Sequence, residues 1–265
     1  MNQEADVLEV HTLLTEQTEL LWNVYHAATE PPGKVNAKAD LANFLFVNAL
    51  HIHQMAKSAL VLMENQSHYA VTLLARSALE GAFIMVASKK DHAFGPQRIA
   101  FELEELARKL QLLQERQIWP ASRRPTPADC VQEADHIRRH YTAPVPATRS
   151  ERDRIQRIER IAEVAGLSPY YDDDYRQLSL AVHSNQAGIL NSTSGYLVRM
   201  GMLALCNATF FASQVITTAF GIKTFDQELN DHLTRMETLM HKLDFIRPSP
   251  FSKEDPAEGG ASHGG

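Results

Sequence analysis

Three residues that could carry out acid–base or phosphate chemistry fall at helical spacing between residues 170 and 190. Arg176, Ser179 and His183 stand at positions i, i+3 and i+7. The seventh residue along an α-helix returns to within ~20° of the first, so a guanidinium, a hydroxyl and an imidazole share one stripe. An imidazole there is suited to general acid or base catalysis, and a guanidinium is suited to stabilising negative charge on a phosphate.

The start of this stretch has the features of a helix N-terminus. Ser168 and Pro169 form a helix-start signal, and Asp172, Asp173 and Asp174 follow in the expected first turn. Acidic side chains there complement the helix dipole. We therefore interpret the three aspartates as dipole partners rather than as metal ligands.

A second polar pair lies in an otherwise apolar helix predicted over residues 68–89. Arg76 and Glu80 are one helical turn apart among alanine, leucine, valine and phenylalanine residues. Charged groups in such surroundings are rarely left unpaired. They either pair with each other along the helix or meet the Arg176/Ser179/His183 stripe across a helix interface as a buried polar network.

These two segments together resemble a widespread bacterial family of helical domains of unknown function. The signatures are Arg-x-x-x-Glu at Arg76 and Glu80, and Tyr-x-x-Leu-Ser-x-x-x-His from Tyr175 through Ser179 to His183. The resemblance spans roughly residues 40 to 220. It implies a helical fold and a polar cluster of these residues, and it carries no activity.

The spacing of Arg176 and His183 is also similar to the Arg-x(4–6)-His signature of HEPN domains. Many HEPN domains are metal-independent ribonucleases of toxin or phage-defence systems, and their sites are usually completed by dimerisation. This resemblance implies catalysis by Arg176 and His183, RNA as the substrate and a homodimer.

Arginines concentrate between residues 123 and 160, on a chain whose net charge is −6. A cluster of this kind can form a phosphate or RNA contact surface. The residues that we consider for phosphate contact are Arg138, Arg139, Arg154 and Arg157. Acidic residues are interleaved with them, so a solvated helix face of mixed charge is the alternative that we favour.

The sequence predicts neither a metal site nor a cofactor. His51 and His53 are two residues apart and point in different directions on a helix, so they cannot share one ion. His136 and His140 have a suitable spacing but enclose two arginines and no glutamate, so the zinc-protease pattern fails. No glycine-rich phosphate loop follows a strand pattern.

Composition favours a soluble protein of the cytoplasm. The chain has a hydrophobic fraction of 44% and only two cysteines, which form no close-spaced motif. Its N-terminal residues lack the order of a signal peptide. Residues 200–222 carry no charge and are long enough to span a bilayer, but they include polar residues and lack flanking basic clusters. We therefore predict a buried core helix there, and no contact with a membrane.

Hydrophobic periodicity predicts an all-α protein, a multi-helix bundle with apolar central helices and charged peripheral helices. We expect one helical domain over residues 1–246, with residues 97–165 as a charged, arginine-rich peripheral insertion and residues 247–265 as a disordered tail. The predicted helices are 7–29, 35–65, 68–89, 95–118, 128–140, 150–165, 170–190, 196–221 and 225–245. Of these we expect 35–65, 68–89, 170–190 and 196–221 to form the core.

Two functional hypotheses follow. The first is a non-catalytic binding or interaction module built around a buried cluster of Arg76, Glu80, Ser179 and His183. The second is a HEPN-like, metal-independent ribonuclease that uses Arg176 and His183.

Overall fold

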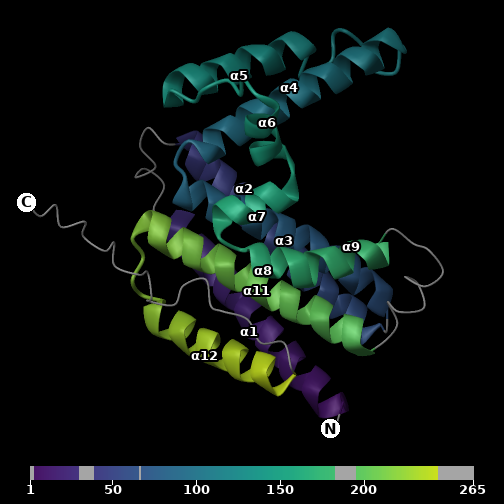
Figure 1. Cartoon of the computed structure of the whole chain (residues 1–265), viewed down its shortest axis with the longest axis vertical. Helices are drawn as coiled ribbons and strands as arrows, with labels where there is room; N and C mark the ends of the chain where they lie inside the picture. Colours follow the sequence, from purple (N-terminus) through teal and green to yellow (C-terminus); the bar gives the residue numbers. More distant parts are fainter. Residues whose placement is uncertain (1–2, 30–38, 66, 183–194, 244–265) are drawn as a thin grey trace, which may run out of the picture.

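Two long apolar helices, α3 (His68–Lys90) and α11 (Gly195–Phe220), pack against each other at the centre of the molecule (Figure 1). The computed structural model describes residues 3–29, 39–65, 67–182 and 195–243. Within these ranges every regular element is a helix, which confirms the predicted all-α bundle. The predicted tail, 247–265, lies outside the described residues.

The surrounding helices complete the bundle in chain order. They are α1 (Gln3–Thr29), α2 (Ala39–Glu64), α4 (Phe94–Glu115), α5 (Pro127–Tyr141), α6 (Arg149–Gln156), α7 (Ile158–Ala165), α8 (Ser168–Tyr170), η1 (Tyr171–Tyr175), α9 (Arg176–Val182) and α12 (Asp226–Lys242). In Figure 1, α4 and α5 lie at one end of the molecule and α12 lies at the other.

Helix α1 belongs to the core, a helix that our expectation left out, while Tyr170, Tyr175 and Leu178 of the expected segment 170–190 also contribute to it. Six side chains of α1 are at most 2% exposed: Val10, Leu13, Leu14, Leu20, Leu21 and Val24. They are buried because α1 packs between α11, α2 and α12. Helix α9, by contrast, packs on α3 along one face only, and Leu180 on its other face is 71% exposed.

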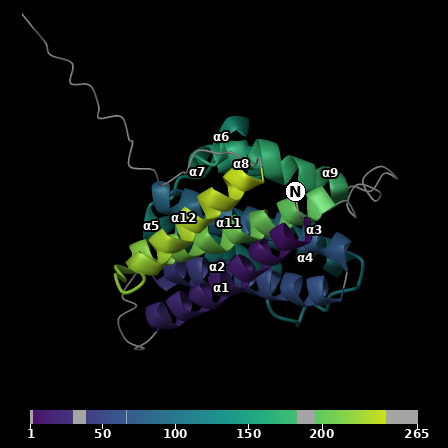
Figure 2. The same cartoon turned by 90° about the horizontal axis from the view of Figure 1, so that it is seen from below.

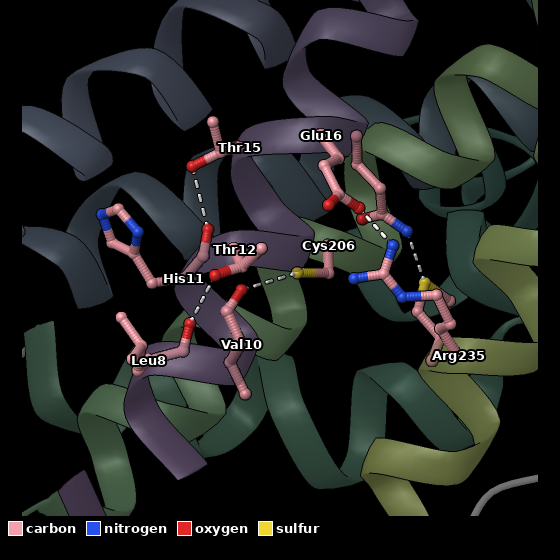
Figure 3. A network of polar contacts seen from close by, with 10 residues as sticks. Leu8, Val10, His11, Thr12, Thr15, Glu16, Cys206 and Arg235 are labelled. Carbon is pink, nitrogen blue, oxygen red and sulfur yellow. Dashed lines mark hydrogen bonds and ion pairs between the residues drawn. The ribbon is translucent and has the colours of Figure 1, made fainter. Parts of the chain in front are cut away.

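Helix α12 is held to α1 by ion pairs at the surface and by a polar contact beneath them. Lys242 pairs with Asp6 at 3.0 Å and with Glu9 at 2.7 Å, and Arg235 pairs with Glu16 (Figure 3). Below, the Gln17 side chain donates to the Met236 sulfur at 2.9 Å and accepts from the Thr209 hydroxyl at 3.2 Å. This contact joins α1, α11 and α12 in the interior. Figure 2 shows α12 beside α11 and α1.

Helices α4 and α5 form a helical arm, with the short helices α6 and α7 beneath it (Figure 1). We predicted one helix over residues 150–165, which is wrong. The chain breaks at Arg157, whose backbone is extended. At the break, the Arg98 guanidinium donates to the Ile155 carbonyl at 2.5 Å, a carbonyl that a continuous helix would use internally. The break lets α7 turn its apolar face onto α3.

We predicted one helix over residues 170–190. The described part of this segment consists of three consecutive helical elements. Helix α8 is followed by a π-helical turn, η1, and then by α9. Residues 183–190 lie outside the described residues. The three aspartates occupy the π-helical turn, and Asp174 is buried at 2% exposure, so only part of this acidic run faces solvent as a dipole partner would.

Two helices, Tyr69–Lys90 and Gly195–Phe220, are long and apolar enough to cross a membrane. Most of each is buried inside the bundle, 67% and 78% of the respective windows. Buried hydroxyls on α11 bond within the helix, since Ser213 and Thr217 each donate to the carbonyl four residues earlier. Both helices therefore have the burial that is expected of core helices in a bundle.

Helices α3 and α11 approach closely at Gly201. A Cβ atom built there would lie 3.7 Å from Ala75, Thr72 and Val71 of α3. This distance is ordinary van der Waals contact, so one carbon fits and a branched side chain does not.

We expect Gly201→Ala to retain or raise the free energy of unfolding, by up to about 1 kcal/mol, because alanine is the better helix former. Gly201→Leu should lower it by about 1–3 kcal/mol through overpacking. Urea unfolding of both variants provides the measurement. Equal stability of the leucine variant and the wild type would contradict the close approach of α3 and α11.

His232 of α12 gives the fold a dependence on pH. Its ring is 6% exposed, and its Nδ1 atom has no hydrogen-bond partner among the described residues. Burial lowers the pKa of His232, and Arg235 adds to that effect. The opposing acids, Glu16, Glu228 and Asp231, do not outweigh it.

A histidine whose pKa is lowered by folding stabilises the fold while it is neutral, and this contribution is lost as the pH falls below about 6.5. We therefore expect the melting temperature to fall between about pH 7.5 and about pH 5.5, and His232→Gln to reduce that fall. His241→Gln, at an exposed position of the same helix, is the control. An identical pH profile for His232→Gln and wild type would refute the assignment.

Candidate functional site

The hydroxyl of Tyr175 lies between Arg76 and Glu80 at the contact of α3 with the π-helical turn. Arg76 Nη2 donates to the Tyr175 hydroxyl at 3.1 Å, and that hydroxyl donates to Glu80 Oε2 at 3.4 Å. The Arg76 guanidinium also stands 5.2 Å from the centre of the Tyr175 ring, within the range of a cation–π contact. These three side chains, which we call the Arg–Tyr–Glu cluster, join segments about a hundred residues apart.

Local structure explains how each member reaches the cluster. Arg76 and Glu80 are one turn apart, so both project from the same face of α3. From residue 81 to residue 88 every residue of α3 is buried, so its two charges emerge just before the helix becomes fully enclosed. Tyr175 ends the π-helical turn and stacks on Tyr171, with ring centres 5.4 Å apart. Turns of this kind occur frequently at functional sites.

The electrostatics of the cluster keep the Tyr175 hydroxyl protonated. Burial raises the pKa of Tyr175, and the Glu80 carboxylate raises it further, while Arg76 opposes both. The tyrosine ring is only 6% exposed. A protonated hydroxyl can accept from the guanidinium and donate to the carboxylate at once, so it bridges two opposite charges.

Arg76 and Glu80 form no direct ion pair within 4.0 Å in the described part of the chain. The sequence left open an intrahelical pair or contact with the Arg176/Ser179/His183 stripe; among the described residues the two charges instead share Tyr175, which precedes that stripe. Arg76 Nε is buried and has no hydrogen-bond partner among the described residues. The guanidinium is thus held at one edge by Tyr175 and leaves a further donor unused.

Arg176 is the first residue of the stripe that also contains Ser179 and His183, and its side chain forms no hydrogen bond or ion pair with the Arg–Tyr–Glu cluster in the described part of the chain. The Arg176 side chain is 64% exposed and pairs with Asp172 at 3.3 Å, one turn earlier. Ser179 is half-buried on α9. His183 lies outside the described residues. The structure therefore brings Tyr175, rather than Arg176, to Arg76 and Glu80.

The four arginines considered for phosphate contact already have partners of their own. Arg138 is bound by Glu104 and lies 3.9 Å from Asp135, and its side chain is only 12% exposed. Arg139 donates to the backbone carbonyl of Asp135 at 3.2 Å.

The other two arginines pair with acids. Arg154 pairs with Asp91 at 2.6 Å, and Arg157 pairs with Asp153 at 3.2 Å. These pairs tie the arm to itself and to the end of α3, which supports the interleaved-charge interpretation over a phosphate surface.

The histidines that the sequence raised as metal ligands lie apart or lack further ligands. His51 contacts the Ser77 hydroxyl at 3.0 Å, between α2 and α3. His136 and His140 are exposed and stack on each other, with ring centres 5.9 Å apart. Among the residues that the structure describes, no group of three or more histidine, cysteine, aspartate or glutamate side chains is placed to hold a metal ion.

Sequence reasoning missed an aromatic cluster between α1 and α2. Trp22 stacks on His53 of α2 at 4.9 Å and meets His26 edge-on at 4.2 Å. The signal in the sequence is the spacing of Trp22, Tyr25 and His26 at i, i+3 and i+4 on one helix. The partner from α2 has no such local signal.

We expect Tyr175→Phe to lower the free energy of unfolding by about 1–2 kcal/mol, because it removes the hydroxyl that both charges use. Tyr171→Phe, a matched change four residues earlier, should cost less than about 0.5 kcal/mol. Chemical denaturation measures both. A double-mutant cycle with Glu80→Gln should show coupling to Tyr175→Phe, and strict additivity would refute the bridge.

Comparison with known proteins identifies the family of this chain but assigns no activity to it. No curated protein and no solved structure matches the chain. A family model described as "Family of unknown function (DUF5677)" matches residues 42–195, which include α2 to α9 and so all three members of the Arg–Tyr–Glu cluster. This confirms the resemblance to a helical family of unknown function. Because the match covers more than half of the sequence, the chain belongs to the family of unknown function DUF5677.

Proposed function

We propose that this protein is a non-catalytic helical binding module whose polar cluster fixes α9 against α3. We assign to that cluster Arg76, Glu80, Tyr175, Ser179 and His183. The observation that carries the proposal is the position of the Tyr175 hydroxyl, which bridges Arg76 and Glu80 with its proton in place.

The protonation state of Tyr175 supports a structural role for the cluster. A general base or a nucleophile must give up its proton near neutral pH, so its pKa has to approach the working pH. The pKa of Tyr175 is raised instead, by burial and by Glu80. The hydroxyl therefore acts as a fixed hydrogen-bonding bridge between two helices.

The surroundings of Arg176 also favour binding over catalysis. An arginine that stabilises a phosphate in a transition state acts best in a site from which water is excluded. Arg176 stands in solvent, and Asp172 partly offsets its charge. The arginines of the arm, which we propose as part of the surface rather than as phosphate ligands, are paired in the same way.

The exposure of Arg176 suits the alternative, a HEPN-like ribonuclease, only if a second copy of the chain completes the site, because that copy would exclude water from Arg176. Under this alternative Arg176 would stabilise the phosphate, His183 would transfer the proton, and RNA would be the substrate.

An RNA-cleavage assay separates the two functions. We expect wild type, Arg176→Ala and His183→Ala to leave a generic single-stranded RNA equally intact in buffer without divalent metal. Circular dichroism provides the control that each variant is folded. Cleavage by the wild type that is lost in both variants would overturn the binding-module proposal and establish the ribonuclease.

A further inference from the structure

A groove between α1 and α2 has the size and composition of a small-ligand site. It encloses about 500 Å³, within the range of ligand pockets in proteins. Helix α1 contributes Thr15, Thr18, Glu19, Trp22 and Asn23, and helix α2 contributes His53, Lys57 and Leu60. Its lining therefore combines an indole, an imidazole, both signs of charge and an amide.

The antiparallel course of α1 and α2 places the charged groups on one side of the aromatic pair. Trp22 contacts His53, while Tyr25 contacts Phe46, with ring centres 5.6 Å apart. Residue numbers thus rise along one helix as they fall along the other. Glu19 precedes Trp22 by about one turn and Lys57 follows His53 by about one turn, so both charges flank the same edge of the aromatic pair, from opposite walls.

The two threonines of this groove donate to backbone carbonyls of α1, but within the described ranges its charged groups and its amide have no such partner, unlike Glu9 and Glu16 of the same helix. Glu9 and Glu16 pair with Lys242 and Arg235 of α12. In the described part of the chain, neither Glu19 nor Lys57 has an opposite charge within 4.0 Å. The hydrogen bonds found among the described residues likewise include none from the Trp22 indole nitrogen and none from the Asn23 amide. The Trp22 side chain is also 40% exposed, so part of its indole can contact a ligand.

We propose that this groove binds a free aromatic amino acid. The aromatic side chain of the ligand packs on Trp22 and Leu60, its carboxylate meets Lys57 and the indole N–H, and its ammonium group meets Glu19 and the Asn23 carbonyl. A ligand with both charges on one carbon satisfies a cation and a carboxylate on facing walls, which an ion of a single sign does not.

The state of His53 agrees with this assignment. Burial lowers the pKa of His53, and the positive charge of Lys57 lowers it further. A neutral imidazole stacked on one face of Trp22 forms an uncharged aromatic pair with it. It also leaves Lys57 as the cation of the α2 wall that is available to a carboxylate.

The two tryptophans of the chain make the test internally controlled. Trp22 lies in the groove, whereas Trp119 lies in the arm, where its indole donates to the Arg123 carbonyl at 3.2 Å. Titration with L-phenylalanine, followed by the indole resonances in a ¹⁵N–¹H NMR spectrum, should shift the Trp22 signal in a saturable way. The Trp119 signal should stay in place.

Three further ligands identify the chemistry that is recognised. N-acetylphenylalanine lacks the ammonium charge, phenylalanine amide lacks the carboxylate, and alanine lacks the aromatic ring. Each should bind at least about tenfold more weakly than phenylalanine. Equal binding of the amide would show recognition of a peptide N-terminus, and equal binding of the acetyl compound would show recognition of a C-terminus. Either result would overturn the free amino acid as the ligand.

Variants of the groove complete the experiment. Lys57→Gln and Glu19→Gln should each weaken binding of phenylalanine by about tenfold or more. Lys109→Gln, on the exposed face of α4, should bind like the wild type. No saturable shift of Trp22 up to about 10 mM phenylalanine, or unchanged affinity in both groove variants, would refute the proposal. The groove lies apart from the Arg–Tyr–Glu cluster, so its failure leaves the proposed binding module to be judged by the RNA assay.

Discussion

The enclosure of α3 is the constraint on which the rest of the structure depends. This helix packs against α11, α2 and α7, and its second half is buried on every side. Two charges on such a helix require polar partners, because an unpaired charge in the interior is costly. Polar partners reach α3 on the side of the helix that faces the π-helical turn. The course of the chain through α8, η1 and α9 follows from that requirement.

The π-helical turn determines which side chain the two charges of α3 contact. It places a tyrosine, a residue with an apolar body and a polar tip, against the point where the two charges leave the core. The ring packs near Phe83, with centres 6.2 Å apart, while the hydroxyl reaches both charges. An arginine at the same place would have added a second cation beside Arg76. The Arg176 side chain is instead exposed to solvent, where Asp172 partly offsets its positive charge.

Polar groups with partners and polar groups without them also differ in position elsewhere in the described part of the molecule. On the arm, Arg138 pairs with Glu104 and Arg154 pairs with Asp91, so these charges serve packing of the arm on itself and on the end of α3. Between α1 and α12, ion pairs cover a polar contact among Gln17, Thr209 and Met236. Between α1 and α2, neither Glu19 nor Lys57 has an opposite charge within 4.0 Å in the described part of the chain, and both lie beside the stacked Trp22 and His53. The proposed ligand groove is based on this combination of charges and aromatic rings.

The sequence by itself determined the fold class and the charge-free stretch as a core helix, because helical periodicity and the absence of charge act within one segment. It also singled out Arg76 and Glu80 through the cost of burying charge, and Tyr175 through the resemblance to a helical family. Only the tertiary structure decided that α1 enters the core and that Tyr175 bridges the two charges. The break at Arg157 depends on Arg98, which comes almost sixty residues earlier, and the Trp22–His53 groove depends on two helices meeting. Periodicity indicates which face of a helix is apolar, but packing decides which partner covers that face.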